Sequence, residues 1–209
     1  MTDGFGYGII GCGWVASAHA WGVQSLADDG VRLIGVADQD EARATELGGR
    51  FGASRITSDY HELLADDAIH VVSICLPDYL HHEVAIAAAE AGKHILCEKP
   101  LSLTVDEADD MLSACERNGV HLGLIMNHRY APGNLLARRV VTSGSLGRPL
   151  IANAVHASGL RGDPGGASPW RGKQRLSMGG VLSTQAIHFL DILLWLGGPV
   201  AAVQAWTDR

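Results

Sequence analysis

The sequence predicts an α/β protein that begins with a doubly wound parallel sheet. Two observations support this fold class. Short apolar runs alternate with segments of helical periodicity over the first 125 residues, and a glycine-rich turn joins the first run to the first helix. Continuous apolar strands are typical of a parallel sheet that is covered by helices on both faces. Right-handed crossovers then give a Rossmann-type arrangement.

Five apolar runs are the predicted strands of this first domain, which we place at residues 1–125. The helices between them show apolar residues at helical spacing. Thr104 and Glu107 form a capping box at the start of the last helix, and Gly119 ends it. The predicted strands are 7–10, 32–37, 71–76, 94–97 and 121–126, and the predicted helices are 15–28, 41–51, 80–91 and the segment after Thr104.

Residues 126–209 are predicted to form part of a second α/β domain. Segments 132–143 and 181–195 have helical patterns, 149–157 and 200–207 are predicted strands, and the glycine-rich segment 158–180 is a predicted long loop. Two strands make a marginal sheet. We therefore expect the natural chain to continue beyond Arg209, with further strands that complete this domain.

Composition and charge narrow the classes of function. Apolar residues make up 47% of the chain and charged residues 19%, as in an ordinary globular protein. The net charge is −7 and no basic cluster is visible, so a nucleic-acid partner is not expected. The apolar segment 192–203 is too short to cross a bilayer, and the N-terminal segment lacks the basic flank of a signal peptide. We expect a cytoplasmic protein without a membrane partner.

The four cysteines do not predict a metal site. None is paired as C-x-x-C, and no histidine lies at zinc-finger spacing from them. Most lie in or beside apolar runs, which favours buried, reduced thiols. They are Cys12, Cys75, Cys97 and Cys115.

A G-x-G-x-x-A fingerprint follows the first predicted strand and opens the first predicted helix, the context that a dinucleotide site requires. Gly11 makes the tight turn, Gly13 lets a pyrophosphate approach the backbone, and Ala16 allows close packing of helix and strand. The helix N-terminus favours the pyrophosphate charge. The full segment is Gly11, Cys12, Gly13, Trp14, Val15 and Ala16.

Asp38 ends the second predicted strand, where a carboxylate bonds the adenosine ribose hydroxyls. It would repel the 2′-phosphate of NADP. The next residues, Gln39, Asp40 and Glu41, supply no cation beside it. The sequence therefore predicts NAD rather than NADP as the cofactor.

Three further stretches make the chain resemble the Gfo/Idh/MocA oxidoreductase family over essentially its whole length. Each of them follows a predicted strand or opens the late helix. The stretches are Cys75-Leu76-Pro77 with His81, Cys97-Glu98-Lys99-Pro100, and Gly179-Gly180-Val181-Leu182 with Thr184 and His188.

The resemblance implies NAD(P)-dependent oxidation or reduction of a sugar, polyol or related small alcohol. It implies a second domain with an open, mostly antiparallel sheet that carries substrate and oligomer contacts, hence a homo-oligomer. Lys99 and His188 would act at the substrate hydroxyl, and the Lys99–Pro100 bond would be cis. The implied cofactor contacts in these stretches are Leu76, Pro77, His81, Glu98 and Lys99.

The late helix carries a polar stripe of Thr184, His188 and Asp191 at helical spacing. Family members commonly have aspartate where Thr184 stands. Threonine can hydrogen-bond to His188 but cannot stabilise its charge, so Lys99 is the stronger catalytic candidate.

Trp170 and Arg171 are further substrate candidates, because an aromatic face stacks on sugars and cations bind hydroxyls or a carboxylate. Three more cations of this segment, Arg161, Lys173 and Arg175, could act with them. The other interpretation of the segment is a solvated loop.

The second functional hypothesis is a non-catalytic, dinucleotide-binding regulator or scaffold on the same fold. The absence of aspartate at position 184 favours it.

Overall fold

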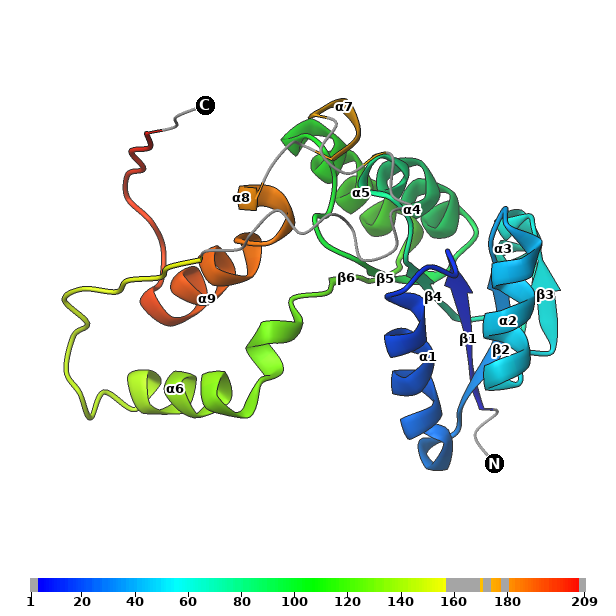
Figure 1. The fold of residues 1–209 in the computed structure, drawn as a ribbon, viewed down its shortest axis with the longest axis horizontal. Helices are drawn as coiled ribbons and strands as arrows, with labels where there is room; N and C mark the ends of the chain where they lie inside the picture. The colour runs from blue at the N-terminus through cyan, green and yellow to red at the C-terminus, as the bar shows by residue number, and fades with distance from the viewer. Residues whose placement is uncertain (1–3, 157–169, 171–173, 178–180, 207–209) are drawn as a thin grey trace. The chain divides into compact units, whose positions relative to one another are not determined.

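The computed structural model describes residues 4–156, 170, 174–177 and 181–206. The chain divides into two compact units, Met1–Ile125 with Trp170–Met178, and Met126–Pro169 with Gly179–Arg209. Figure 1 follows the chain through its helices and strands.

A parallel six-stranded sheet forms the centre of the first unit, as the sequence predicts. Its strand order is β3-β2-β1-β4-β5-β6, the order of a doubly wound fold. The strands are β1 Phe5–Ile10, β2 Val31–Ala37, β3 Arg55–Thr57, β4 Val71–Ile74, β5 His94–Cys97 and β6 Leu122–Leu124. Ile10 pairs with Ala37 on one side and with Ile74 on the other, so the central strands end together at one carboxyl edge.

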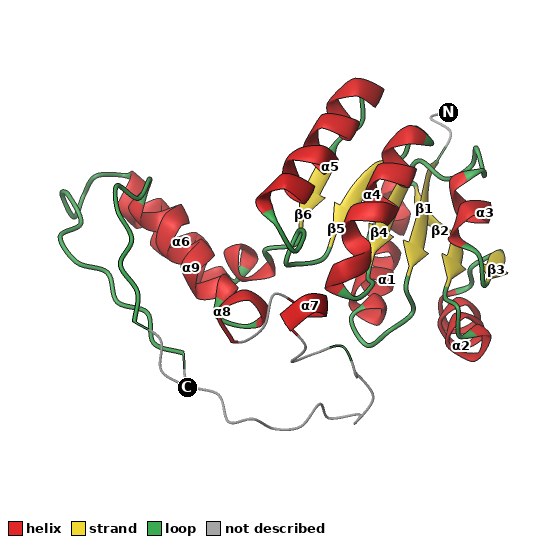
Figure 2. Cartoon of the chain, turned by 90° about the horizontal axis from the view of Figure 1, so that it is seen from above, coloured by secondary structure: helices red, strands yellow, loops and turns green. Residues whose placement is uncertain are grey.

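Helices cover both faces of this sheet, and Figure 2 shows α4 on one side with α1 behind the strands. The helices α1 (Ala16–Ser25) and α2 (Glu41–Phe51) pack with Ile9 in one buried cluster. The helices α3 (Tyr60–Leu64), α4 (His81–Glu90) and α5 (Val105–Asn118) pack with Ile10 in the other. Ile9 and Ile10 are fully buried on opposite faces, and each contributes roughly 1.5–3 kcal/mol.

Side-chain caps fix where most of these helices begin. Asp40 accepts the Ala42 N–H at 3.1 Å and Asp59 accepts the His61 N–H at 2.9 Å, at the starts of α2 and α3. The predicted capping box of α5 is confirmed in its N-cap half, since Thr104 accepts the Glu107 N–H at 3.2 Å, whereas the Glu107 carboxylate accepts the Leu103 N–H at 2.8 Å rather than that of Thr104. The helix α1 differs, because Val15 stands at its N-cap position without a side-chain hydrogen bond.

Two neighbouring elements between residues 55 and 64 escape prediction from the sequence. The strand β3 has three residues at the sheet edge, and its one partner among the described strands is β2. The helix α3 has five residues and starts at its Asp59 cap. Both are too short to show an apolar period, and β3 depends on a partner distant in sequence.

The second unit contains η3 (Asn127–Tyr130), α6 (Pro132–Thr142), α8 (Val181–Thr184) and α9 (Ile187–Gly197). The predicted strands 149–157 and 200–207 are wrong for the parts that the structure describes, 149–156 and 200–206, which form no strand. The described residues of this unit therefore lack the expected antiparallel sheet. The physical reason is that extended segments need partner strands, and these two remain unpaired.

The predicted helix 181–195 is interrupted. A turn at Gln185 and Ala186 separates α8 from α9, so Thr184 does not share a continuous helical face with His188. The predicted loop 158–180 lies mainly outside the described residues, and its described part contains the short helix α7 (Gln174–Ser177). Where the structure describes the chain, no single helix meets the length and apolarity required to cross a bilayer; only the bent pair Arg175–Thr184 and Ile187–Gly197 meets them jointly.

The four cysteines are buried free thiols, as the sequence predicts. Burial raises the pKa of each, and for Cys12 burial, together with the nearby Asp38 carboxylate, raises it to about 12. The nucleophile in alkylation is the thiolate. A raised pKa therefore protects these side chains at neutral pH.

We predict that iodoacetamide labels Cys12 in the folded protein about a thousandfold more slowly at pH 8 than in the urea-unfolded protein, because the rise from the ordinary pKa of 9.0 to about 12 removes that share of thiolate. The rate should increase steadily as pH rises towards 12. Peptide mass spectrometry measures it, and equal rates in both states would contradict the prediction.

Lys93 is a buried cation that stabilises the turn after α3. Its ammonium group donates to the backbone oxygens of Asp66 at 2.8 Å and Ile69 at 2.9 Å, and the residue is only 6% exposed. Hydrogen bonds from a charged donor are stronger than neutral ones. The side chain therefore connects this turn to the start of β5.

We expect Lys93→Met to lower the free energy of unfolding by about 1–3 kcal/mol, because the buried Ile69 carbonyl loses its donor and the Asp66 carbonyl keeps only the bond from the Ile69 N–H. Urea denaturation measures the change. The matched control is Arg117→Met on the exposed side of α5, which should change stability by about 0.5 kcal/mol or less. Equal effects of the two substitutions would refute the role of Lys93.

Candidate dinucleotide and catalytic site

The carboxyl edge of the sheet brings together the turns that follow β1, β2, β4 and β5. Gly11 follows β1 with a φ of +91°, and a Cβ there would lie 2.5 Å from the Cys75 backbone oxygen. Only glycine satisfies both conditions. By contrast, a Cβ on Gly13 would meet no atom within 4 Å, so its surface is open to a ligand.

The N-terminus of α1 is suited to bind an anion. Ala16 is fully buried against the sheet, which brings the helix close to the glycine turn. Val15 provides no side-chain cap, and the Ala16 and Ala18 N–H groups donate to the Gly13 and Val15 oxygens at 3.1 and 2.9 Å, so the donors left to a ligand are the N–H groups of the turn just before the helix. Trp14 is 93% exposed beside them. A pyrophosphate fits this combination of free donors and helix dipole.

Asp38 is oriented by the backbone around it. One carboxylate oxygen accepts the Cys12 N–H at 2.7 Å and the other accepts the Asp40 N–H at 2.9 Å. Asp38 thus also connects the end of β2 to the glycine turn, a role that the sequence fingerprint does not reveal. Arg43, the next cation along the chain, pairs with Asp40 at 3.2 Å.

A polar hollow of about 380 Å³ adjoins this turn at the end of β3. Glu41 and Glu62 are among its lining residues, with Thr57 and Ser58. Asp38 is linked to it because its N–H donates to the Thr57 oxygen at 3.2 Å. Carboxylates in this region disfavour an additional phosphate on the ribose.

His81 connects the turns that follow β4 and β5. It is fully buried, with Nε2 at 2.9 Å from the Leu76 oxygen and Nδ1 at 2.8 Å from the Pro100 oxygen. The Lys99–Pro100 peptide is cis, as the resemblance implies. Any effect of His81 on a bound ligand must act through its neighbours, such as Leu76 and Pro100, because its ring has no free surface.

Glu98 and Lys99 follow β5, and Glu98 has a partner that the sequence analysis missed. Its Oε1 lies 3.1 Å from Nε2 of His19 in α1, and its Oε2 accepts the Lys99 N–H at 3.2 Å. The available signal was the position of His19, one turn from Ala16 and next to Ala20 on the buried face of α1. A polar residue there needs a partner.

The second unit holds the other catalytic candidate, His188 of α9. Its ring stacks on that of His128 in η3, with centroids 4.3 Å apart and planes 16° apart. Asp191 binds Arg129 through two contacts of 2.8 and 2.5 Å, and this hydrogen bonding raises the pKa of Arg129. The three residues of the predicted polar stripe therefore do not act together on one helix face. Thr184 lies in α8, and Asp191 binds Arg129 of η3.

Of the predicted substrate residues in the glycine-rich segment, Trp170 is half-buried and clusters with the first unit. Arg171 lies outside the described residues, as do Arg161 and Lys173. Arg175 lies in α7 and is exposed.

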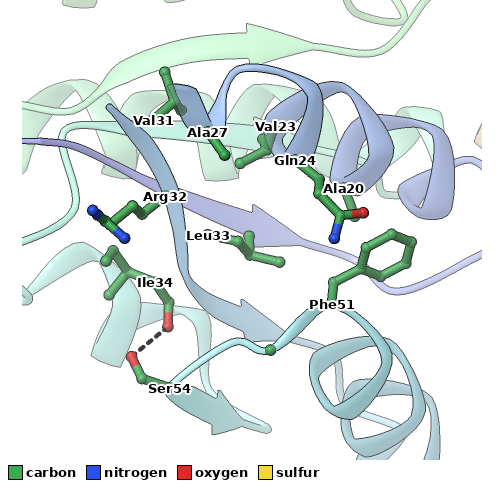
Figure 3. Close-up of a pocket in the computed structure, with 11 residues that line it drawn as sticks. Ala20, Val23, Gln24, Ala27, Val31, Arg32, Leu33, Ile34, Phe51 and Ser54 are labelled. Carbon is green, nitrogen blue, oxygen red and sulfur yellow. Dashed lines mark hydrogen bonds between the residues drawn. The ribbon is translucent and has the colours of Figure 1, made fainter. Parts of the chain in front are cut away.

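A second hollow lies away from these turns, at the amino end of β2 (Figure 3). It has a volume of about 350 Å³ and is lined by residues at the ends of α1 and α2, including Val23, Gln24 and Phe51. Ser54 donates to the Ile34 oxygen at 3.0 Å at its border. None of the predicted site residues lines it.

Known proteins support the interpretation of this edge as a dinucleotide site. Residues 5–126 match the model described as "Oxidoreductase family, NAD-binding Rossmann fold", and residues 134–209 match the "GFO/IDH/MocA C-terminal domain". The two matches meet close to the end of the parallel sheet.

Levoglucosan dehydrogenase of Pseudarthrobacter phenanthrenivorans is 36% identical over 209 residues, covering 95% of this chain and 52% of that protein. Inositol 2-dehydrogenase 2 of Saccharopolyspora erythraea is 32% identical over 208 residues, covering 97% and 57%. A solved levoglucosan dehydrogenase in complex with NADH and levoglucosan has a TM-score of 0.82 at 31% identity, covering 93% of this chain and 54% of that one.

The chain thus spans about half the length of the curated relatives it matches. The two family matches indicate the same family, and the geometry of the turns at the carboxyl edge fits the dinucleotide site of that family. The chain therefore belongs to the Gfo/Idh/MocA oxidoreductase family and binds NAD(H).

Proposed function

We propose that this protein is an NAD-dependent dehydrogenase or reductase that transfers hydride between the nicotinamide and a hydroxyl or keto carbon of a sugar, polyol or related small molecule. The observation that carries the proposal is the position of Lys99. It follows β5 at the carboxyl edge, where ligands of doubly wound sheets bind. Relatives named for levoglucosan and inositol support this substrate class.

The residues of the carboxyl edge fit the cofactor. The N–H groups at Gly13, Trp14 and Val15 would face the pyrophosphate, and Asp38 would bind the adenosine ribose. Leu76, Pro77 and Glu98 follow β4 and β5 and would line the nicotinamide half. When bound, the nicotinamide supplies the hydride acceptor or donor of the reaction.

Lys99 would hold the proton of the substrate hydroxyl during oxidation and return it during reduction. Glu98 restrains the Lys99 backbone through the 3.2 Å bond to its N–H. His188 would assist from the second unit. Its ring is held against His128, and Thr184 supplies no carboxylate to stabilise its charge.

Trp170, Arg171, Thr184 and His188 are the proposed substrate contacts, since aromatic faces stack on sugars and polar groups bind their hydroxyls. The second unit would also carry contacts between copies of the chain. Apolar side chains exposed over most of their surface support this surface role, for example Leu150, Ile151 and Val155.

One observation favours the alternative of a non-catalytic, dinucleotide-binding regulator. Position 184 holds threonine where family members commonly carry aspartate, and the Asp191 carboxylate binds Arg129. A screen of polyols and sugar acids that follows NADH absorbance discriminates the two functions.

We predict that the protein binds NADH at least about tenfold more tightly than NADPH, because Asp38 would lose a charge-assisted bond and repel the extra phosphate. Asp38→Asn should reduce the difference between the affinities for NADH and NADPH, since the asparagine side chain keeps a hydrogen-bond acceptor but loses the negative charge. Titration of tryptophan fluorescence measures both affinities. Asp109→Asn on the exposed side of α5 is the matched control, and equal affinities in the wild type would refute the assignment.

We expect Lys99→Met to lower kcat by roughly 10² to 10⁴ while NADH affinity remains nearly unchanged, because a proton relay acts in the chemical step. His188→Ala should cost less. Steady-state kinetics and cofactor titration check both variants. Full activity of Lys99→Met would remove Lys99 from the mechanism, and equal losses would overturn the ranking of the two residues.

A further inference from the structure

A chain of four polar side chains, one fully buried and three half-buried, crosses the first unit and ends beside Lys99. The hydroxyl groups of Tyr7 in β1 and Ser73 in β4 lie 2.8 Å apart. Ser73 lies 2.6 Å from Nδ1 of His19, whose Nε2 reaches Glu98 at 3.1 Å. The chain thus links the middle of the sheet, the face of α1 and the turn after β5.

The chemistry of its ends determines the proton positions. An ionised carboxylate only accepts hydrogen bonds, so Nε2 of His19 donates to Glu98. Nδ1 of a neutral imidazole then accepts the Ser73 hydroxyl hydrogen. Because Ser73 has one hydroxyl hydrogen and gives it to His19, the Tyr7 phenol donates to Ser73, and burial, although the bond with Ser73 opposes it, raises the pKa of Tyr7. For a neutral His19 ring, the chain therefore selects the tautomer with its proton on Nε2.

Glu98 remains charged although water hardly reaches it. Its side chain is 12% exposed and that of His19 is 6% exposed. Burial raises the pKa of Glu98, but the bond from His19, followed by the contacts with Lys99, outweighs burial and leaves the pKa below its usual value. Among the described residues, the thiols of Cys75 and Cys97 also face Glu98, and burial keeps them neutral.

A space-filling role would not require this arrangement. The neighbouring residues Ala16 and Ala20 show that apolar side chains pack well on this face of α1. Replacing buried charged and polar groups by apolar ones is often neutral or stabilising. The polar chain instead directs the His19 Nε2–H to one Glu98 oxygen, while the other Glu98 oxygen accepts the backbone N–H of Lys99.

We propose that His19 is a positioning residue that holds Glu98 charged and oriented beneath the turn that presents Lys99, with Ser73 selecting its tautomer. The effect on Glu98 stands by itself. The effect on turnover rests on the proposed function of Lys99.

Two substitutions of His19 separate its two bonds. In His19→Asn the amide lies near the position of Nδ1, so it can reach Ser73 but not Glu98; in His19→Gln it lies near Nε2 and can reach Glu98. We expect His19→Asn to raise the pKa of Glu98 and His19→Gln to leave it near the wild-type value. NMR titration of ¹³C-labelled glutamate carboxylates measures this without turnover.

In the enzyme assay, His19→Asn should lower kcat by about 10- to 100-fold through misplacement of the turn, with a smaller change in KM. Because Glu98 must be ionised, the acidic limb of the kcat profile should move to higher pH. His19→Gln should retain kcat within about threefold of wild type. This rescue distinguishes a hydrogen-bonding role from loss of packing.

An unchanged Glu98 titration in His19→Asn overturns the inference. Equal Glu98 shifts in both variants, with equal losses in Tm, also overturn it and indicate a packing role. If the wild type turns over no sugar or polyol, the proposed function fails, but the carboxylate titration still decides the role of His19.

Discussion

The carboxyl edge of the parallel sheet leaves backbone groups of successive turns without strand partners, and the site depends on how side chains satisfy them. Asp38 accepts N–H groups from the turns after β1 and β2. His81 contacts carbonyls of the turns after β4 and β5, and Glu98 accepts the N–H of Lys99. The residues that a sequence motif would assign to the ligand therefore also build the edge on which the ligand binds. Because these side chains also bind the backbone of the turns, charged groups can be held rigidly at the end of a sheet.

How much could be predicted from the sequence depends on whether a segment carries its own signal. The strands β1, β2, β4 and β5 are apolar runs with caps and turns nearby, and they are where the sequence predicts them. The edge strand β3 has no such signal in the sequence, and it is recognised from its pairing with β2 in the structure. In the second unit, segment 149–156 alternates like a strand and 200–206 is mostly apolar, but both lack partners among the described residues, and a sequence pattern alone does not form a sheet.

The helix of the second unit shows a different limit. Apolar periodicity over 181–195 predicts one helix, yet the chain turns at Gln185 and Ala186. Ser183 and Thr184 precede that turn, and hydroxyl side chains compete with the helical backbone for hydrogen bonds. Periodicity records which side chains are apolar, not whether the backbone remains continuous. The predicted alignment of Thr184 with His188 failed for this reason, whereas His188 and Asp191 both lie in α9.

The candidate site shows why sequence motifs predict the positions of site residues better than the contacts between those residues. Gly11, Asp38 and Lys99 stand in recognisable contexts, so the sequence predicts their turns. His19 and Ser73 stand within apolar segments, where a single polar residue looks like an interruption of the pattern. Their partners lie 79 and 66 residues away along the chain, at Glu98 and Tyr7. Because a buried polar group without a partner costs free energy, each such interruption should be treated as evidence for a distant partner. Applied to this protein, that rule leads from His19 in the first helix to Glu98, the residue before Lys99.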